Sequence, residues 1–197
     1  MRLFVALEIP PDVSANLAGF LKDMNALSEQ FGQKWMRWVR PENLHVTLKF
    51  IGEVSDAKLD GIRAALATVR GEGPFDICIR GMGFFPNEER ATVLWTGLDA
   101  AENLASLAST IDDAMATQGV RRENRAFLPH LTLARFAPPG IQGSSGIEKK
   151  LLAAIKQNGE REFGSFVARE FHLLESKLKP SGAEYTTLHS FPFVAGA

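Results

Sequence analysis

The chain is poor in cysteine, histidine and tyrosine, with one, four and one of them among 197 residues. A single cysteine, Cys78, excludes a disulfide framework and a thiolate metal site and suits a reducing cytoplasm. No run of 18 apolar residues exists, and the first apolar segment is interrupted by Glu8 and preceded only by Arg2 as a basic residue. We therefore expect a cytoplasmic protein with no signal peptide and no membrane span.

An excess of charge of either sign is also lacking, since 22 Lys and Arg stand against 23 Asp and Glu, for a net charge of -1. A protein that coats long nucleic acids carries a large basic excess, so this class is excluded, whereas a small or terminal anionic ligand is not. With 45% hydrophobic residues, residues 1–197 can build the core of one domain. No protein partner is implied, and we expect a monomer.

The spacing of apolar residues predicts the secondary structure, because alternation is typical of strands and a period of 3.6 of helices. The predicted strands are 2–9, 34–39, 44–51, 75–85, 92–97, 130–136, 166–177 and 185–194, and the predicted helices are 12–31, 56–69, 102–118 and 147–157. Short connections suit antiparallel pairing, so we expect a hairpin of 34–39 with 44–51 and an α+β fold. The segment 138–146, rich in Pro, Gly and Ser, is predicted to be a linker.

One short pattern occurs twice, as His45-Val46-Thr47-Leu48 and as His130-Leu131-Thr132-Leu133. In a strand, the His and Thr of each copy share one face and lie about 6.6 Å apart along the backbone, so both can reach one phosphate-sized group. Because the pattern returns, we expect two similar lobes whose sheets face a shared cleft, with one motif in each lobe. Aligning the cations that follow the motifs, Lys49 and Arg135, leaves one extra residue in the second copy.

Two imidazoles can serve as general base and general acid on one phosphorus atom, while hydroxyls and a guanidinium hold its oxygens. Strict alternation puts Arg135 on the face opposite His130, so Arg135 needs a bulge, a strand end or a curled side chain to take part. A metal site is the other interpretation, but neither His45 nor His130 has an adjacent carboxylate, and no His-Glu-x-x-His is present. We expect no metal and no cofactor, and we expect His172 and His189 to be structural or solvent-facing.

The segments 37–53 and 127–135, which carry the two motifs, resemble the bacterial and archaeal RNA 2',3'-cyclic phosphodiesterases of the 2H phosphoesterase superfamily, also called 2'-5' RNA ligases. The resemblance implies a bilobal α+β fold with helices outside, and metal-free opening of a 2',3'-cyclic phosphate to a 2'-phosphomonoester. It also implies a reverse reaction that joins RNA ends through a 2'-5' bond. By resemblance, the catalytic pair is His45 and His130, and the phosphate ligands are Thr47, Thr132 and Arg135.

Other residues are candidates for contacts with an RNA end, such as a tRNA fragment. The aromatic candidates for stacking on a terminal base are Phe4, Trp38, Phe84, Phe85 and Tyr185. The arginines that flank the motifs are Arg37, Arg40, Arg121, Arg122 and Arg125. Two alternatives stay open: another 2H-type phosphodiesterase, acting on 2'-5' oligonucleotides or small cyclic nucleotide phosphates, and a non-catalytic module that binds RNA ends. The sequence does not decide which histidine is the base.

Overall fold

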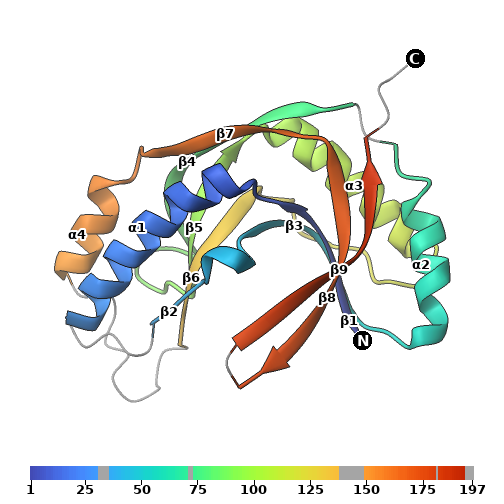
Figure 1. The fold of residues 1–197 in the computed structure, drawn as a ribbon, viewed down its shortest axis with the longest axis horizontal. Coiled ribbons are helices and arrows are strands. Elements are labelled where there is room, and N and C mark those ends of the chain that lie inside the picture. Colours follow the sequence, from blue (N-terminus) through green and yellow to red (C-terminus); the bar gives the residue numbers. More distant parts are fainter. Residues whose placement is uncertain (31–35, 71–72, 138–148, 181, 194–197) are drawn as a thin grey trace.

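The computed structural model describes residues 1–30, 36–70, 73–137, 149–180 and 182–193, and contains two antiparallel sheets (Figure 1). The His45 sheet has the order β3-β1-β8-β9 and consists of β1 (Arg2–Glu8), β3 (His45–Glu53), β8 (Glu170–Lys179) and β9 (Gly182–Pro192). The His130 sheet has the order β2-β6-β5-β4-β7 and consists of β2 (Met36–Trp38), β4 (Phe75–Phe85), β5 (Val93–Asp99), β6 (His130–Phe136) and β7 (Glu162–Ala168). The predicted bilobal α+β architecture is confirmed. The predicted linker 138–146 lies outside the described residues.

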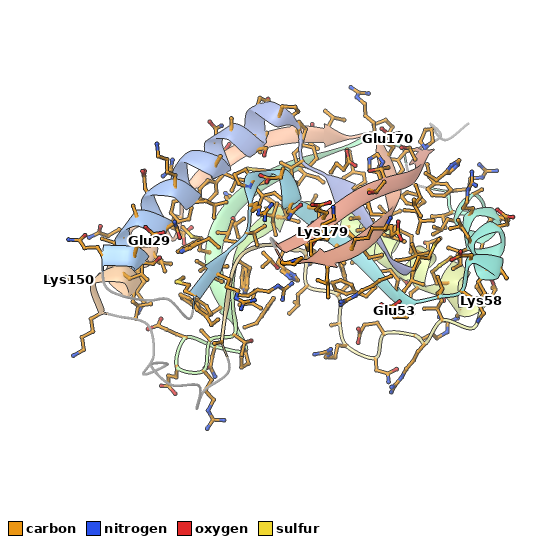
Figure 2. The ribbon with its side chains drawn as sticks, turned by 60° about the horizontal axis from the view of Figure 1, so that its bottom comes forward. Glu29, Glu53, Lys58, Lys150, Glu170 and Lys179 are labelled. Atoms are coloured by element: carbon orange, nitrogen blue, oxygen red, sulfur yellow. The ribbon has the colours of Figure 1, made fainter. Side chains whose placement is uncertain are left out.

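The helices cover the outer faces of the two sheets (Figure 1). On the His130 sheet, α1 (Pro11–Gln30) packs against β2 and β7, with α4 (Lys149–Gln157) beside it. On the His45 sheet, α3 (Ala101–Ala116) packs against β3, with α2 (Leu59–Leu66) beside it. Figure 2 shows the charged side chains of Glu29, Lys58 and Lys150 at the outer ends of the molecule. Two 3-10 turns, η1 (Pro41–Asn43) and η2 (Asp56–Lys58), precede β3 and α2.

A glycine lets α1 approach the His130 sheet closely. Gly164 of β7 has a φ of +136°, and a Cβ added there would lie 3.3 Å from the side chain of Val13. The amide of Asn16 donates a hydrogen bond to the carbonyl of Phe163 at 3.1 Å. A side chain at position 164 would therefore strain the backbone at this positive φ, and Val13 would have to shift by a few tenths of an ångström.

Alternation decides which face of each central strand is buried. Leu3, Val5 and Leu7 of β1, and Leu131 and Leu133 of β6, are at most 1% exposed and belong to one continuous apolar core. The residues between them point the other way, and the histidine and threonine of each motif, on β3 and β6, are only half-buried. The core therefore presents both His-x-Thr motifs on open strand faces, as the period of 2 predicts.

Two predicted strand arrangements are wrong. β2 does not form a hairpin with β3, because β2 pairs with β6 in one sheet and β3 pairs with β1 in the other. The predicted strand 166–177 is two strands, since β7 ends at Ala168 and β8 begins at Glu170, where the chain changes sheets. Apolar alternation locates a strand, but it does not identify the strand's neighbour.

Candidate active site

A bulge in β6 decides where Arg135 points. Trp95 of β5 pairs with Thr132 and the preceding Leu94 pairs with Ala134, so Leu133 is an extra residue in β6. Leu133 and Ala134 are both fully buried, which shifts the alternation by one position. Arg135 is therefore exposed on the same face as His130 and Thr132, and of the three alternatives predicted for its participation, a bulge, a strand end or a curled side chain, the bulge is the one that is present.

The same bulge occurs in β3. Ala6 of β1 pairs with Thr47 and Val5 pairs with Lys49, which leaves Leu48 as the extra residue. The bulge buries Lys49 to 7% exposure and brings Phe50, 62% exposed, onto the face of His45. The two strands therefore align without an insertion, and the prediction that Lys49 corresponds to Arg135 is wrong. The residue of β3 that corresponds to Arg135 is Phe50.

The buried Lys49 connects the two halves of the site. Its ammonium forms an ion pair with Asp112 of α3 and donates a hydrogen bond to the carbonyl of Arg121 at 2.7 Å. Asp112 also accepts a hydrogen bond from the backbone N–H of Glu123 at 3.2 Å. Because the segment that follows α3 leads into β6, these contacts fix the first His strand relative to the entry of the second.

Both motif histidines are held in the same way. Nδ1 of His45 lies 2.7 Å from the carbonyl oxygen of Asn43, and Nδ1 of His130 lies 2.7 Å from that of Leu128. A carbonyl oxygen only accepts, so Nδ1 carries the hydrogen in both rings. Each neutral imidazole therefore has Nε2 as the nitrogen that can take up a proton.

Burial and nearby positive charges lower the pKa of both motif histidines. Burial lowers the pKa of His45 below its ordinary value of 6.5, the charges of Arg135 and His130 lower it further, and the hydrogen bond to Asn43 opposes the shift. Burial and then Arg135 lower the pKa of His130, against its hydrogen bond to Leu128. Arg135 therefore acts on both imidazoles, although they belong to different sheets. β3 and β6 also approach each other within 8 Å between Cα atoms.

Two convergent imidazoles with an arginine beside them match a known family. The model of the LigT-like phosphoesterases matches residues 7–95 and 98–185, and one His-x-Thr motif falls in each matched stretch. The chain belongs to this family. It is 33% identical over 192 residues to the RNA 2',3'-cyclic phosphodiesterase of Methanothermobacter thermautotrophicus, covering 97% of this chain and 98% of that protein. A protein of the same name from Methanocaldococcus jannaschii is 33% identical over 188 residues, covering 95% and 98%.

Solved structures agree with the LigT-like assignment. A protein from Thermus thermophilus superposes with a TM-score of 0.78 at 28% identity and covers all of both chains. Escherichia coli LigT complexed with 3'-AMP superposes with a TM-score of 0.72 at 25% identity, covering 98% of this chain and 97% of that one. The family predicted from the two motifs is confirmed.

Aromatic rings flank the histidines of both His-x-Thr motifs. The ring centroid of His45 lies 5.0 Å from Phe4 and 5.1 Å from Tyr185, and that of His130 lies 4.9 Å from Phe85. The other aromatic candidates pack elsewhere: Phe84 lies against Phe136 in the core, and the indole of Trp38 donates a hydrogen bond to Ser28. Phe4 is only 3% exposed, so it is a buried ring that packs against the imidazole of His45. Sequence reasoning did not single out Phe50, because its position on the open face depends on the bulge.

The flanking arginines differ in their partners. Arg40 pairs with Glu42, Arg122 with Asp113, and Arg125 with Glu123. The side chains of these three arginines are already engaged with acids of the protein. Arg37 instead lies on β2 directly opposite Arg135.

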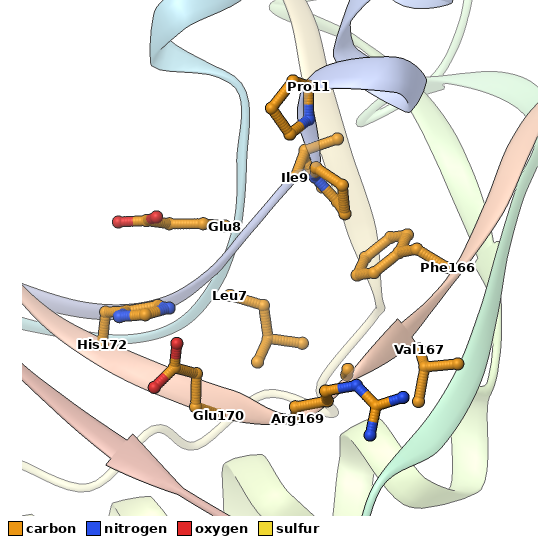
Figure 3. A pocket seen from close by; sticks show the side chains of 11 residues that line it. Leu7, Glu8, Ile9, Pro11, Phe166, Val167, Arg169, Glu170 and His172 are labelled. Atoms are coloured by element: carbon orange, nitrogen blue, oxygen red, sulfur yellow. The ribbon is translucent and has the colours of Figure 1, made fainter.

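A pocket of about 310 Å³ lies where the chain crosses between the sheets (Figure 3). Figure 3 shows Glu8, Glu170 and His172 on one side of it and Phe166 and Val167 on the other. Glu8 pairs with His45 in the strand register, so the pocket adjoins the site. His172 is buried, with Nδ1 3.0 Å from the hydroxyl of Ser190.

Among the residues that the structure describes, no group of three or more His, Cys, Asp and Glu side chains is arranged to hold a metal ion. None of the described helices is long and apolar enough to cross a membrane. His189, predicted to be structural or solvent-facing, accepts a hydrogen bond at Nδ1 from Arg63 at 3.3 Å.

Proposed function

We propose that this protein hydrolyses 2',3'-cyclic phosphates at RNA ends to 2'-phosphomonoesters. The named activity of its relatives supports this, since two of them are RNA 2',3'-cyclic phosphodiesterases that match over nearly their whole length. The observation that carries the proposal is the pair of imidazoles. His45 and His130 come from different sheets, each keeps Nε2 for proton transfer, and Arg135 acts on both.

The two histidines divide the proton transfers of the reaction. One takes a proton from water at Nε2 as the water oxygen attacks phosphorus, and the other gives its Nε2 proton to the 3' oxygen as the P–O3' bond breaks. The products are a 3' hydroxyl and a 2'-phosphomonoester. Attack and departure occur on opposite sides of phosphorus, and two imidazoles held by separate sheets suit such an arrangement. The same two proton transfers, with a 5' hydroxyl in place of water as the nucleophile, would join RNA ends through a 2'-5' bond.

Thr47, Thr132 and Arg135 stabilise the phosphate. Each hydroxyl lies on the same strand face as the histidine of its motif. The bulge in β6 puts the guanidinium of Arg135 on the face that carries His130. A guanidinium can donate two parallel hydrogen bonds to the non-bridging oxygens and balance the charge that grows on them. None of these steps requires a metal ion or a cofactor.

Three finer expectations belong to the same proposal. We expect a monomer in the cytoplasm, and RNA fragments such as those of tRNA as physiological substrates. The near-neutral charge of the chain favours a substrate that is held at its end over one that is bound along its length.

The decisive experiment supplies a short RNA with a terminal 2',3'-cyclic phosphate and identifies the product. We expect a 2'-phosphate, which a 3'-specific phosphatase leaves intact. A 3'-phosphate product would contradict the direction of ring opening. Binding without turnover would instead support the RNA-end-binding module, and turnover confined to 2'-5' dinucleotides would support the other phosphodiesterase alternative.

A further inference from the structure

Two arginines lie side by side on the open face of the His130 sheet. Arg37 of β2 pairs with Arg135 of β6 in an antiparallel register, with Met36 opposite Phe136 as the next pair. Met36 and Phe136 are both buried, whereas Arg37 and Arg135 are both exposed. Since partners in an antiparallel pair share a face, both guanidiniums extend from the face that carries His130 and Thr132.

Among the residues that the structure describes, no acid forms an ion pair with either member of this pair of arginines. Arg122 and Arg125, in contrast, pair with Asp113 and Glu123. Like charges directly opposite each other in a sheet repel and destabilise it. An arrangement that costs stability in the free protein is explained if anionic groups bind there.

The two arginines differ in their distance from the histidines. Arg135 lies on the strand of His130, and its charge lowers the pKa of both imidazoles. We therefore assign Arg135 to the phosphate that reacts. Arg37 lies one strand farther out, at the edge of the His130 sheet. An anion bound by Arg37 is therefore a neighbour of the reacting phosphate.

We propose that Arg37 binds the internucleotide phosphate adjacent to the terminal cyclic phosphate, and that this contact makes the site prefer an oligonucleotide over a mononucleotide. The proposal rests on the proposed function for the identity of the reacting group. It adds a second phosphate subsite, formed by Arg37 on β2, which a nucleoside 2',3'-cyclic phosphate cannot occupy because it has only one phosphate.

The test compares two substrates in Arg37→Met: a nucleoside 2',3'-cyclic phosphate, and a dinucleotide that ends in the same cyclic phosphate. We expect kcat/KM for the dinucleotide to fall about tenfold, the value of one hydrogen bond to a charged group, while kcat/KM for the mononucleotide stays unchanged. The salt dependence for the dinucleotide should lose about 0.7 from its log-log slope. Lysine keeps the charge but loses the planar fork, so kcat/KM of Arg37→Lys for the dinucleotide should lie between the values of the wild type and of Arg37→Met.

The matched control is Arg125→Met, which removes the same charge from an arginine that is 89% exposed and paired with Glu123. Arg125→Met should leave kcat/KM unchanged for both substrates. Equal losses on both substrates in Arg37→Met would assign Arg37 to the reacting phosphate, and no loss on the dinucleotide would remove the second subsite; either outcome overturns the proposal.

A binding measurement separates this proposal from the proposed function. A dinucleotide with a 3'-phosphate should bind the protein more tightly than a nucleoside 3'-phosphate, and Arg37→Met should abolish most of that difference. If the protein hydrolyses neither cyclic substrate, the proposed function fails, whereas the affinity difference and its loss in Arg37→Met still decide whether the second subsite exists.

Discussion

The strands β3 and β6 are alike up to the bulge and differ after it. Both hold a histidine by a carbonyl two residues earlier, and both place a threonine beside it. After the bulge, β3 buries Lys49 and exposes Phe50, whereas β6 buries Ala134 and exposes Arg135. The shared residues are the histidines, to which we assign proton transfer, and the threonines, to which we assign phosphate binding. The residues that differ give the site an aromatic side and a cationic side, from which we infer that the substrate binds in one orientation.

The largest effect is expected from removing either member of the shared pair. His45→Ala and His130→Ala should each lower turnover by about 10² to 10⁴, because a positioned acid or base contributes that much. His189→Ala is the control, since its imidazole contacts Arg63, and turnover should stay within about twofold. If one histidine variant kept a large part of wild-type turnover while the other did not, the two strands would not be equivalent.

Removing the cation tests the side that β6 alone provides. Arg135→Met should lower kcat by about 10², which is typical for a lost donor to a developing oxyanion. Because Arg135 lowers the pKa of both histidines, the variant should also show both limbs of its pH profile at higher pH. A loss of activity without this displacement would place the guanidinium away from the imidazoles.

Removing the aromatic ring tests the side that β3 alone provides. Phe50→Ala should raise KM about tenfold with little change in kcat, because stacking on a base contributes about 1 to 3 kcal/mol to binding. The control for the loss of an exposed apolar side chain is Leu178→Ala, near the tip of the β8–β9 hairpin, where the residue is 74% exposed and KM should not change. An unchanged KM in Phe50→Ala would mean that the base lies elsewhere.

The pH profile tests whether the pair shares one environment. One histidine must be neutral and the other protonated, and both pKa values lie below 6.5 in the free protein, mainly through burial. The maximum of kcat/KM should therefore fall on the acid side of 6.5, with activity lost as pH rises through the pKa of the acid. Bound phosphate favours the charged imidazole, so the kcat profile should lie at higher pH than that of kcat/KM. Coincident profiles would argue against a phosphate between the two rings.

Chelation should have no effect. Dialysis against EDTA should leave turnover unchanged, because the proposed reaction assigns proton transfer to His45 and His130 and charge stabilisation to Arg135. Activity that EDTA abolishes and zinc or manganese restores would refute the two-histidine mechanism.

Much of the site could be predicted from local sequence patterns, and the limits have a physical origin. The positions of His45, Thr47, His130 and Thr132 follow from alternation over three residues, which the sequence displays directly. The exposure of Phe50 depends on a one-residue bulge, which is decided by pairing with β1 rather than by β3 alone. The partner of β2 and the break at Arg169 depend in the same way on strands that are distant in the chain.

The order of strands in the His45 sheet has a consequence for biosynthesis. β1 lies between β3, which follows soon after it, and β8, which begins at Glu170. At ribosomal speeds of about 5 to 20 residues per second, one edge of the nascent β1 waits on the order of 10 s for its second partner. Unpaired edges of this kind recruit other chains. A polypeptide that stops before β8 should therefore aggregate, and the two halves of the chain should not yield separate folded lobes when they are expressed alone.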